Sequence, residues 1–295
     1  MMTNLRVLVA TDLGASSDGA LLRAHAYALA LGAELVVCHV VPDARKSNPL
    51  FPERNEVDLL QGTGMIARAG VLVGEQLARL AIPDETRVAI ESGSPEEEIV
   101  RLAEDEHATL IVLGASLRHT NERPGRVAER VVRYAHASVL IVRKGPTTGR
   151  ILVATDLSTS SEPAHAVGGL LVKAALEEAT LLHVMEQQPA LSATAAMSAL
   201  GCPWLPPPAS VIDELQELRL ATLQGIAAQH GFTSVEQFDG DPATIIVERS
   251  AAISAEMIIL GSRGRTRLRR MLLGSVAEAV VRRSECSVLV AREGA

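Results

Sequence analysis

The 295-residue chain has few aromatic residues and no long apolar run. Aromatics make up 2% and apolar residues 47%, so a core must be built from Ala, Val, Leu and Ile. Such a core favours small-faced helices packed on Val- and Ile-rich strands. No apolar run approaches the roughly 18 residues that a membrane span needs. We therefore expect a soluble α/β protein that is long enough for two domains.

A basic surface is also missing, because the formal net charge is -7. Nucleic-acid binding needs a basic footprint, so we expect no nucleic-acid partner. The cysteines Cys38, Cys202 and Cys286 lack metal-ligand spacing, and we interpret Cys38 and Cys286 as core residues. The N-terminal apolar run is interrupted by Arg6 and Asp12, which does not match a signal peptide. We expect a cytoplasmic protein with no membrane partner.

The sequence contains an internal repeat. Residues 6–13 read RVLVATDL and residues 150–157 read RILVATDL, an offset of 150 − 6 = 144. Residues 125–129 (GRVAE) match residues 274–278 (GSVAE) at an offset of 274 − 125 = 149. A turn-rich GPTTG segment separates the two copies. The predicted domains are residues 1–145 and 150–295.

Each copy alternates apolar strands with helices, which predicts a parallel sheet covered on both faces. The predicted strands are 6–11, 34–40, 87–91, 109–113 and 138–142, then 150–155, 179–184, 234–238, 257–260 and 287–291. The predicted helices include 16–31, 95–106, 162–176 and 211–230, with long connections at 42–65 and 186–212. Ligands of such sheets bind beyond the carboxyl ends of the strands, where the strand order reverses.

A glycine-rich segment follows the predicted strand 257–260. Two residues separate Gly261 from Gly264, and nine more precede Gly274 and Ser275, which open a helix. Glycine lets backbone N–H groups approach an anion, and the first helical turn leaves N–H groups unpaired. Neither a Walker A motif nor the G-x-G-x-x-G fingerprint occurs. The spacing G-x2-G-x9-G-S predicts a phosphate-binding loop.

This spacing, its position before the last helix and strand, and the tandem repeat resemble the ATP-binding branch of the universal stress protein family. The resemblance covers nearly the whole chain. It implies two five-stranded parallel α/β domains, Rossmann-like and similar to the adenine-nucleotide-alpha-hydrolase fold. Family members pair through their last strands, so the resemblance implies a pseudo-dimer within this chain, with 139–142 beside 287–291. It also implies ATP as the ligand, with Mg2+.

The resemblance implies roles for residues of the second copy. Asp156, beside Thr155, is expected at the adenosine end of the ligand or as the holder of a magnesium-bound water. The backbone at Val184 is expected to read adenine. The loop and helix start are expected to take the phosphates, through Leu260, Gly261, Arg263, Gly264, Arg265, Gly274, Ser275 and Val276.

The first copy departs from this pattern. The matching residues that it retains are Asp12, Val40, Gly114 and Gly125. Leu117 replaces the middle glycine, Arg126 replaces the serine, and the loop is two residues shorter, since 125 − 114 = 11 and 274 − 261 = 13. A leucine disfavours close approach of backbone to phosphate. We therefore expect a degenerate first site and a structural or regulatory role for this copy.

Other roles and functions stay open at this point. Asp12 and Asp156 are also suited to be helix N-caps, and the loop glycines to a tight turn. We interpret His39 and His183 as hydrogen-bonded core histidines. The chain is expected to be a non-enzymatic, stress-related regulator that binds an adenine nucleotide. The alternatives are a slow ATPase or phosphotransfer enzyme and a ligand-free dimerisation module. Further possible partners are a second copy of the chain, as a homodimer, and a regulatory protein.

Overall fold

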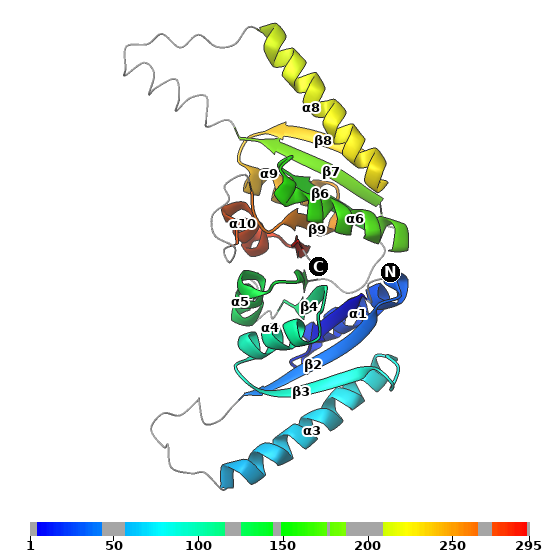
Figure 1. The fold of residues 1–295 in the computed structure, drawn as a ribbon, viewed down its shortest axis with the longest axis vertical. Helices are drawn as coiled ribbons and strands as arrows, with labels where there is room; N and C mark the ends of the chain where they lie inside the picture. Colours follow the sequence, from blue (N-terminus) through cyan, green and yellow to red (C-terminus); the bar gives the residue numbers. More distant parts are fainter. Residues whose placement is uncertain are drawn as a thin grey trace, which may run out of the picture.

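The computed structural model describes residues 5–42, 57–115, 125–143, 149–175, 178–186, 209–264 and 273–293. Two successive series of strands and helices follow each other along the chain (Figure 1). The first series comprises β1 Arg6–Ala10, α1 Ala15–Leu31, β2 Glu34–Pro42, α3 Val57–Arg79, β3 Arg87–Gly93, α4 Pro95–Asp105, β4 Leu110–Gly114, α5 Arg126–Tyr134 and β5 Ser138–Val142.

The second series repeats this order. It comprises β6 Arg150–Thr155, the 3-10 turn η1 Thr159–Ser161, α6 Glu162–Ala175, β7 Glu178–Met185, α8 Ala209–His230, β8 Ser234–Asp239, α9 Pro242–Ala252, β9 Ala255–Gly261, α10 Ser275–Arg283 and β10 Ser287–Ala291. The ten predicted strands are therefore confirmed, and their ends shift by no more than two residues.

Both predicted long connections extend too far, and the one over residues 186–212 overlaps α8, which begins at Ala209. The connection predicted over residues 42–65 overlaps α3, which already begins at Val57. Gly62 and Gly64 lie in the first turns of this helix, and glycine lowers helix propensity by about 1 kcal/mol relative to alanine. The local sequence therefore predicts a later start for α3 than the structure shows.

The strands form one ten-stranded sheet in the order β3-β2-β1-β4-β5-β10-β9-β6-β7-β8. Within the described residues, every pairing is parallel except that of β5 with β10, where Leu140 lies opposite Leu289. This antiparallel pair joins the two halves and confirms the expected pseudo-dimer. The strand order reverses between β1 and β4 and again between β6 and β9.

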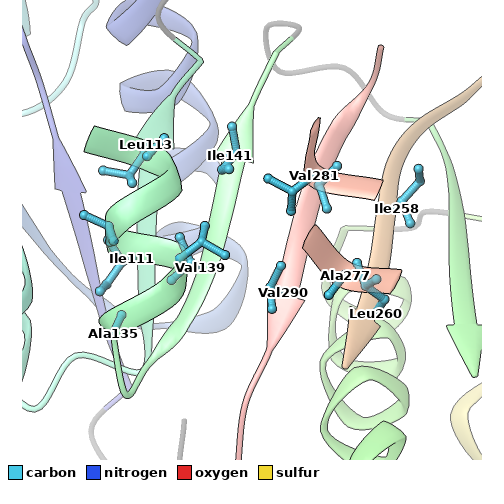
Figure 2. Packing of buried hydrophobic residues seen from close by; sticks show 14 of the residues in the cluster. Ile111, Leu113, Ala135, Val139, Ile141, Ile258, Leu260, Ala277, Val281 and Val290 are labelled. Carbon is cyan, nitrogen blue, oxygen red and sulfur yellow. The ribbon is translucent and has the colours of Figure 1, made fainter. Parts of the chain in front are cut away.

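Both faces of the sheet carry a core that is continuous across the seam, the junction of β5 with β10. On one face, α4, α5, α9 and α10 contribute to a cluster that includes Val139 and Val290. Figure 2 shows these side chains under α5 and α10 on either side of the junction. On the other face, α1, α3, α6 and α8 contribute to a cluster that includes Leu140 and Leu289. Neither half therefore completes its core alone.

Polar contacts at the seam are reciprocal. The Arg143 N–H donates to Ser287 Oγ (3.1 Å), and the Arg292 N–H donates to Ser138 Oγ (3.2 Å). The seam is thus an internal pseudo-two-fold interface in which each terminal strand receives the same contact from its counterpart.

Ion pairs between α5 and α10 follow the same symmetry. Arg133 donates to Glu278 (3.1 Å), and Arg282 lies 3.3 Å from Glu129. The matched helices of the two halves therefore face each other across the seam.

The outer helices α3 and α8 are only partly covered. Val73 and Leu223 are fully buried against the sheet, whereas Met65 and Leu218 are exposed nearer the N-termini of these helices. Among the described residues, no helix combines the length and the apolarity that crossing a membrane requires.

We expect Leu140→Ala to destabilise the whole molecule, because the Leu140 side chain is 0% exposed in the shared core. A cavity of this kind costs about 2–5 kcal/mol in unfolding free energy, measured as a lower denaturant midpoint. Leu29→Ala is the matched control, since Leu29 is 70% exposed and its change should stay within about 0.5 kcal/mol. Equal midpoints for the two variants would contradict this assignment of the core.

Candidate functional site

The sequence-predicted site lies where the strand order of the second half reverses. β6 and β9 are adjacent and parallel, with Val153 opposite Ile259. β6 ends at Thr155 and β9 at Gly261, so Asp156 and residues 262–264 leave the same edge of the sheet side by side. This is the position at which open α/β sheets bind their ligands.

The Asp156 carboxylate is fixed by the turn that follows β6. Its Oδ1 accepts hydrogen bonds from the Ser158 N–H (3.0 Å), Ser158 Oγ (2.6 Å) and Ser161 Oγ (2.7 Å). Thr155 Oγ1 accepts from the Leu157 N–H (3.0 Å), and Leu157 has a positive φ of 60°. A leucine rarely adopts this conformation, so the turn is held by these hydrogen bonds.

The first half has the same turn. Asp12 Oδ1 accepts from the Gly14 N–H and from Ser17 Oγ, both at 2.9 Å, and Leu13 has φ 62°. The N-cap interpretation of Asp12 and Asp156 is wrong, because α1 is capped at Gly14 and η1 at Ser158. Each aspartate closes the turn before the cap.

Gly261 is required by the packing of the fold, because a larger residue would not fit there. A Cβ atom at Gly261 would lie 2.5 Å from the carbonyl oxygen of Ser160, and one at Gly114 would lie 2.5 Å from that of Ser16. Real Cβ contacts are essentially never this short. These two glycines therefore allow the helical segment that follows the first strand of each half, α1 or η1, to approach the end of the fourth strand.

Gly264 and Gly274 have no such requirement. A Cβ atom would lie 3.4 Å from Asp156 Oδ2 at Gly264, and 3.4 Å from its nearest neighbours, Arg263 Cα and the Ser262 carbonyl oxygen, at Gly274. Gly274 has an ordinary φ of -66°. The Gly274 N–H donates to the Ser262 carbonyl (2.9 Å), which brings residues 262–264 against residues 274–276. We call these two segments the glycine cradle.

The described residues leave the helix start in the cradle without a side-chain cap. Gly274 is the N-cap of α10 and makes no side-chain capping bond, and Ser275 is exposed. Unpaired N–H groups and the helix dipole favour negative charge at this end. Half-buried Arg263 lies beside Gly274 and adds a cation. Arg265 lies outside the described residues.

The apolar site residues contribute backbone only. The side chains of Val184 and Leu260 belong to the buried core, and Val276 packs against it. Val184 lies in β7 between β6 and β8, directly after His183. A nucleotide would therefore meet peptide groups at these three positions.

The first half offers a different surface at the equivalent place. Gly125 caps α5 with φ -62° and ψ 157°, close to the -66° and 152° of Gly274. Arg126 then stands exposed at the first helical position, where the helix dipole disfavours a cation. Val40 is buried in the core as Val184 is. Leu117 lies outside the described residues.

The strand histidines are hydrogen-bonded, as interpreted. Nδ1 of His183 lies 2.8 Å from the Thr155 carbonyl oxygen, and Nδ1 of His39 lies 2.8 Å from that of Thr11. In the part of the chain that the structure describes, no three His, Cys, Asp or Glu side chains are grouped to hold a metal ion.

A buried histidine lies in α6, the helix that follows the Asp156 turn. His165 is 4% exposed, and its position matches Leu21, since 165 − 144 = 21. Burial, with a smaller contribution from His230, lowers the pKa of His165 to about 4, and Asp156 opposes the shift. His165 is thus neutral in the folded protein near pH 7.

The fold defines a tandem pair of Rossmann-like α/β domains, and the second of them carries the glycine cradle. The family model described as "Universal stress protein family" matches residues 3–143 and 147–292. The chain belongs to the universal stress protein family.

Several relatives match over most of their length. The chain is 31% identical over 231 residues to Universal stress protein Rv2623 of Mycobacterium tuberculosis, covering 75% of this chain and 73% of that one. It is 28% identical over 305 aligned positions to Universal stress protein Rv2005c of the same species, covering 97% of both. The crystal structure of a universal stress protein from Archaeoglobus fulgidus covers 99% of both chains, with TM-score 0.67 and 22% identity, and supports the fold.

Sequence reasoning missed the groups that hold the site in place. Ser158 and Ser161 orient Asp156, and the Ser160 carbonyl explains Gly261. The internal repeat could have indicated the role of Ser161, because Ser17 and Ser161 are separated by the repeat offset of 161 − 17 = 144. Each of these serines donates a hydrogen bond to the aspartate of its own half.

Alanine substitutions should separate the roles of the glycines. Gly261→Ala is expected to cost about 1–3 kcal/mol, because its Cβ would overlap the Ser160 carbonyl. Gly264→Ala should leave the thermal midpoint nearly unchanged, since its Cβ makes an ordinary contact. Thermal unfolding of both variants measures this, and a larger loss for Gly264→Ala than for Gly261→Ala would refute the distinction.

Stability should depend on His165 between its unfolded pKa of 6.5 and its folded pKa of about 4. Because the folded pKa is depressed, the contribution is full above pH 6.5 and is lost as the pH falls towards 4. The loss is roughly 3 kcal/mol, from about 1.4 kcal/mol per pKa unit. Urea unfolding at several pH values should give a flatter profile for His165→Leu, which installs the residue of the first half. Parallel profiles would show that His165 does not carry this dependence.

Proposed function

We propose that residues 150–295 bind ATP at the glycine cradle and that the protein is a cytoplasmic, stress-related regulator controlled by this nucleotide. One observation carries the proposal. Gly264 and Gly274 have no folding requirement for glycine, yet they lie together at an open helix start beside Asp156. Their missing side chains leave backbone N–H groups accessible to phosphate oxygens.

The two ends of the site suit the two ends of the nucleotide. Asp156, held by Ser158 and Ser161, offers an acceptor to ribose hydroxyls or to a magnesium-bound water. The peptide groups at Val184 lie along the same sheet edge and are proposed to read adenine. The cradle, with Ser275 and Arg263, is proposed to hold the phosphates.

We propose that residues 1–145 act as the structural or regulatory partner. The scaffold of their site is intact at Asp12, Gly114 and Gly125. Arg126, however, places a long cationic side chain at the helix start that Ser275 leaves open. One nucleotide per chain is the expected stoichiometry.

Purified protein should release about one adenine nucleotide per chain on denaturation, and added ATP should raise the thermal midpoint. At a ligand concentration of 100 times Kd this stabilisation is about 2.7 kcal/mol. Gly274→Asp should abolish both effects, because it places a carboxylate where phosphate binds, while aspartate remains a good N-cap. Gly125→Asp, at the matching cap of α5, is the control and should bind ATP normally.

The same experiment separates the alternatives. Steady accumulation of ADP would identify a slow ATPase. ATP, ADP, AMP and cAMP are compared because the sequence leaves the adenine-bearing ligand open. No released nucleotide and no heat of binding with any of them would contradict the proposal and favour a ligand-free dimerisation module.

A further inference from the structure

A buried arginine at the seam has no counter-ion in the described part of the chain. Arg292 follows β10 directly and is 9% exposed. Its Nη2 donates to the Val132 carbonyl at the end of α5, in the other half. Its Nε has no hydrogen-bond partner, and no carboxylate of the described residues pairs with it. A buried cation is costly unless an anion or further hydrogen bonds compensate it.

Arg292 adjoins the glycine cradle. The Ser262 N–H donates to the Ala291 carbonyl (3.0 Å), so Arg263 and Arg292 each follow a residue of this hydrogen-bonded pair just beyond the ends of β9 and β10, one residue out of register with each other. Arg263 also lies beside Gly274 at the start of α10. Burial, and then the charge of Arg263, lower the pKa of Arg292 to about 10, as expected for two cations that repel each other. The two arginines and the start of α10 therefore lie on neighbouring segments of the chain, and each of the three favours a nearby anion.

We propose that Arg263 and Arg292 form a two-arginine anion subsite at the seam, which takes the charge of the terminal phosphates and makes the site prefer triphosphates to monophosphates. This inference rests on the proposed function and adds its specificity determinant. An anion there removes the repulsion between the guanidinium groups and supplies the missing counter-ion. Since Arg292 also binds Val132, the subsite links the nucleotide to the first half.

The pseudo-symmetry provides a matched control. Arg143 holds the same place after β5, donating from its N–H to Ser287 Oγ (3.1 Å) and from Nη2 to the Val281 carbonyl (2.8 Å). The residue of the first half that matches Arg263 is Ser116, since Ala115 makes the contact to Val142 that Ser262 makes to Ala291. Arg143→Gln therefore removes the side-chain contact to Val281, the counterpart of the Arg292 contact to Val132, without touching the cradle.

Calorimetric affinities for ATP and AMP test the subsite in the full-length chain. R292Q should lower the ratio of ATP to AMP affinity about tenfold, and R143Q should leave it unchanged. R292K keeps a charge but loses the guanidinium fork, so about a threefold loss is expected, and this variant serves if R292Q does not fold. The ATP affinity of R292Q should also depend less on salt than that of the wild type.

Two results would overturn the inference. The first is an unchanged ratio of ATP to AMP affinity in the folded Arg292 variants. The second is an equal fall of this ratio in R143Q, which would show that Arg292 acts only as a seam residue. Inorganic tripolyphosphate separates this failure from that of the proposed function. If the wild type binds tripolyphosphate through Arg292 but binds no ATP, the subsite stands and the nucleotide proposal falls. If the wild type binds neither, both fall.

Discussion

The antiparallel pairing of β5 with β10 is the contact on which the structure depends. It turns two five-stranded parallel sheets into one, and it lets both core layers run from one half into the other. Leu140 and Leu289 are wholly buried there, and Arg143 and Arg292 cross it in opposite directions. The seam therefore fixes how the two potential sites lie relative to each other, and it sets a charged residue of each half against the other.

Duplication has kept the scaffold of the site and changed its surface. Both halves hold the aspartate in the same strained turn and need glycine at the end of the fourth strand, at Gly114 and Gly261. They differ at the positions that the fold leaves free. Gly264 and Gly274 are open in the second half, whereas Arg126 stands at the helix start of the first. The surface of this region can thus differ between the two copies while the pseudo-dimer keeps the same scaffold.

Most of the fold was predictable because its signals are local. Apolar strand runs, helical spacing and the repeat are read directly from neighbouring residues, and the pairing of the last strands followed from the family resemblance. Features that depend on distant contacts were not predictable. The need for Gly261 arises from a carbonyl at Ser160, and the burial of Arg292 arises from α5 in the other half. The early start of α3 was hidden because Gly62 and Gly64 lower the helix propensity of its first turns.

We propose that the glycine cradle binds a triphosphate. A crystal structure of the full-length chain grown with a non-hydrolysable ATP analogue and Mg2+ tests it most directly. We predict triphosphate density against the N–H groups of Gly264 and Ser275, with Asp156 at the adenosine end or on the metal, and none at Arg126 in the first half. A cradle filled by side chains of the protein, or nucleotide bound only in the first half, would contradict the account.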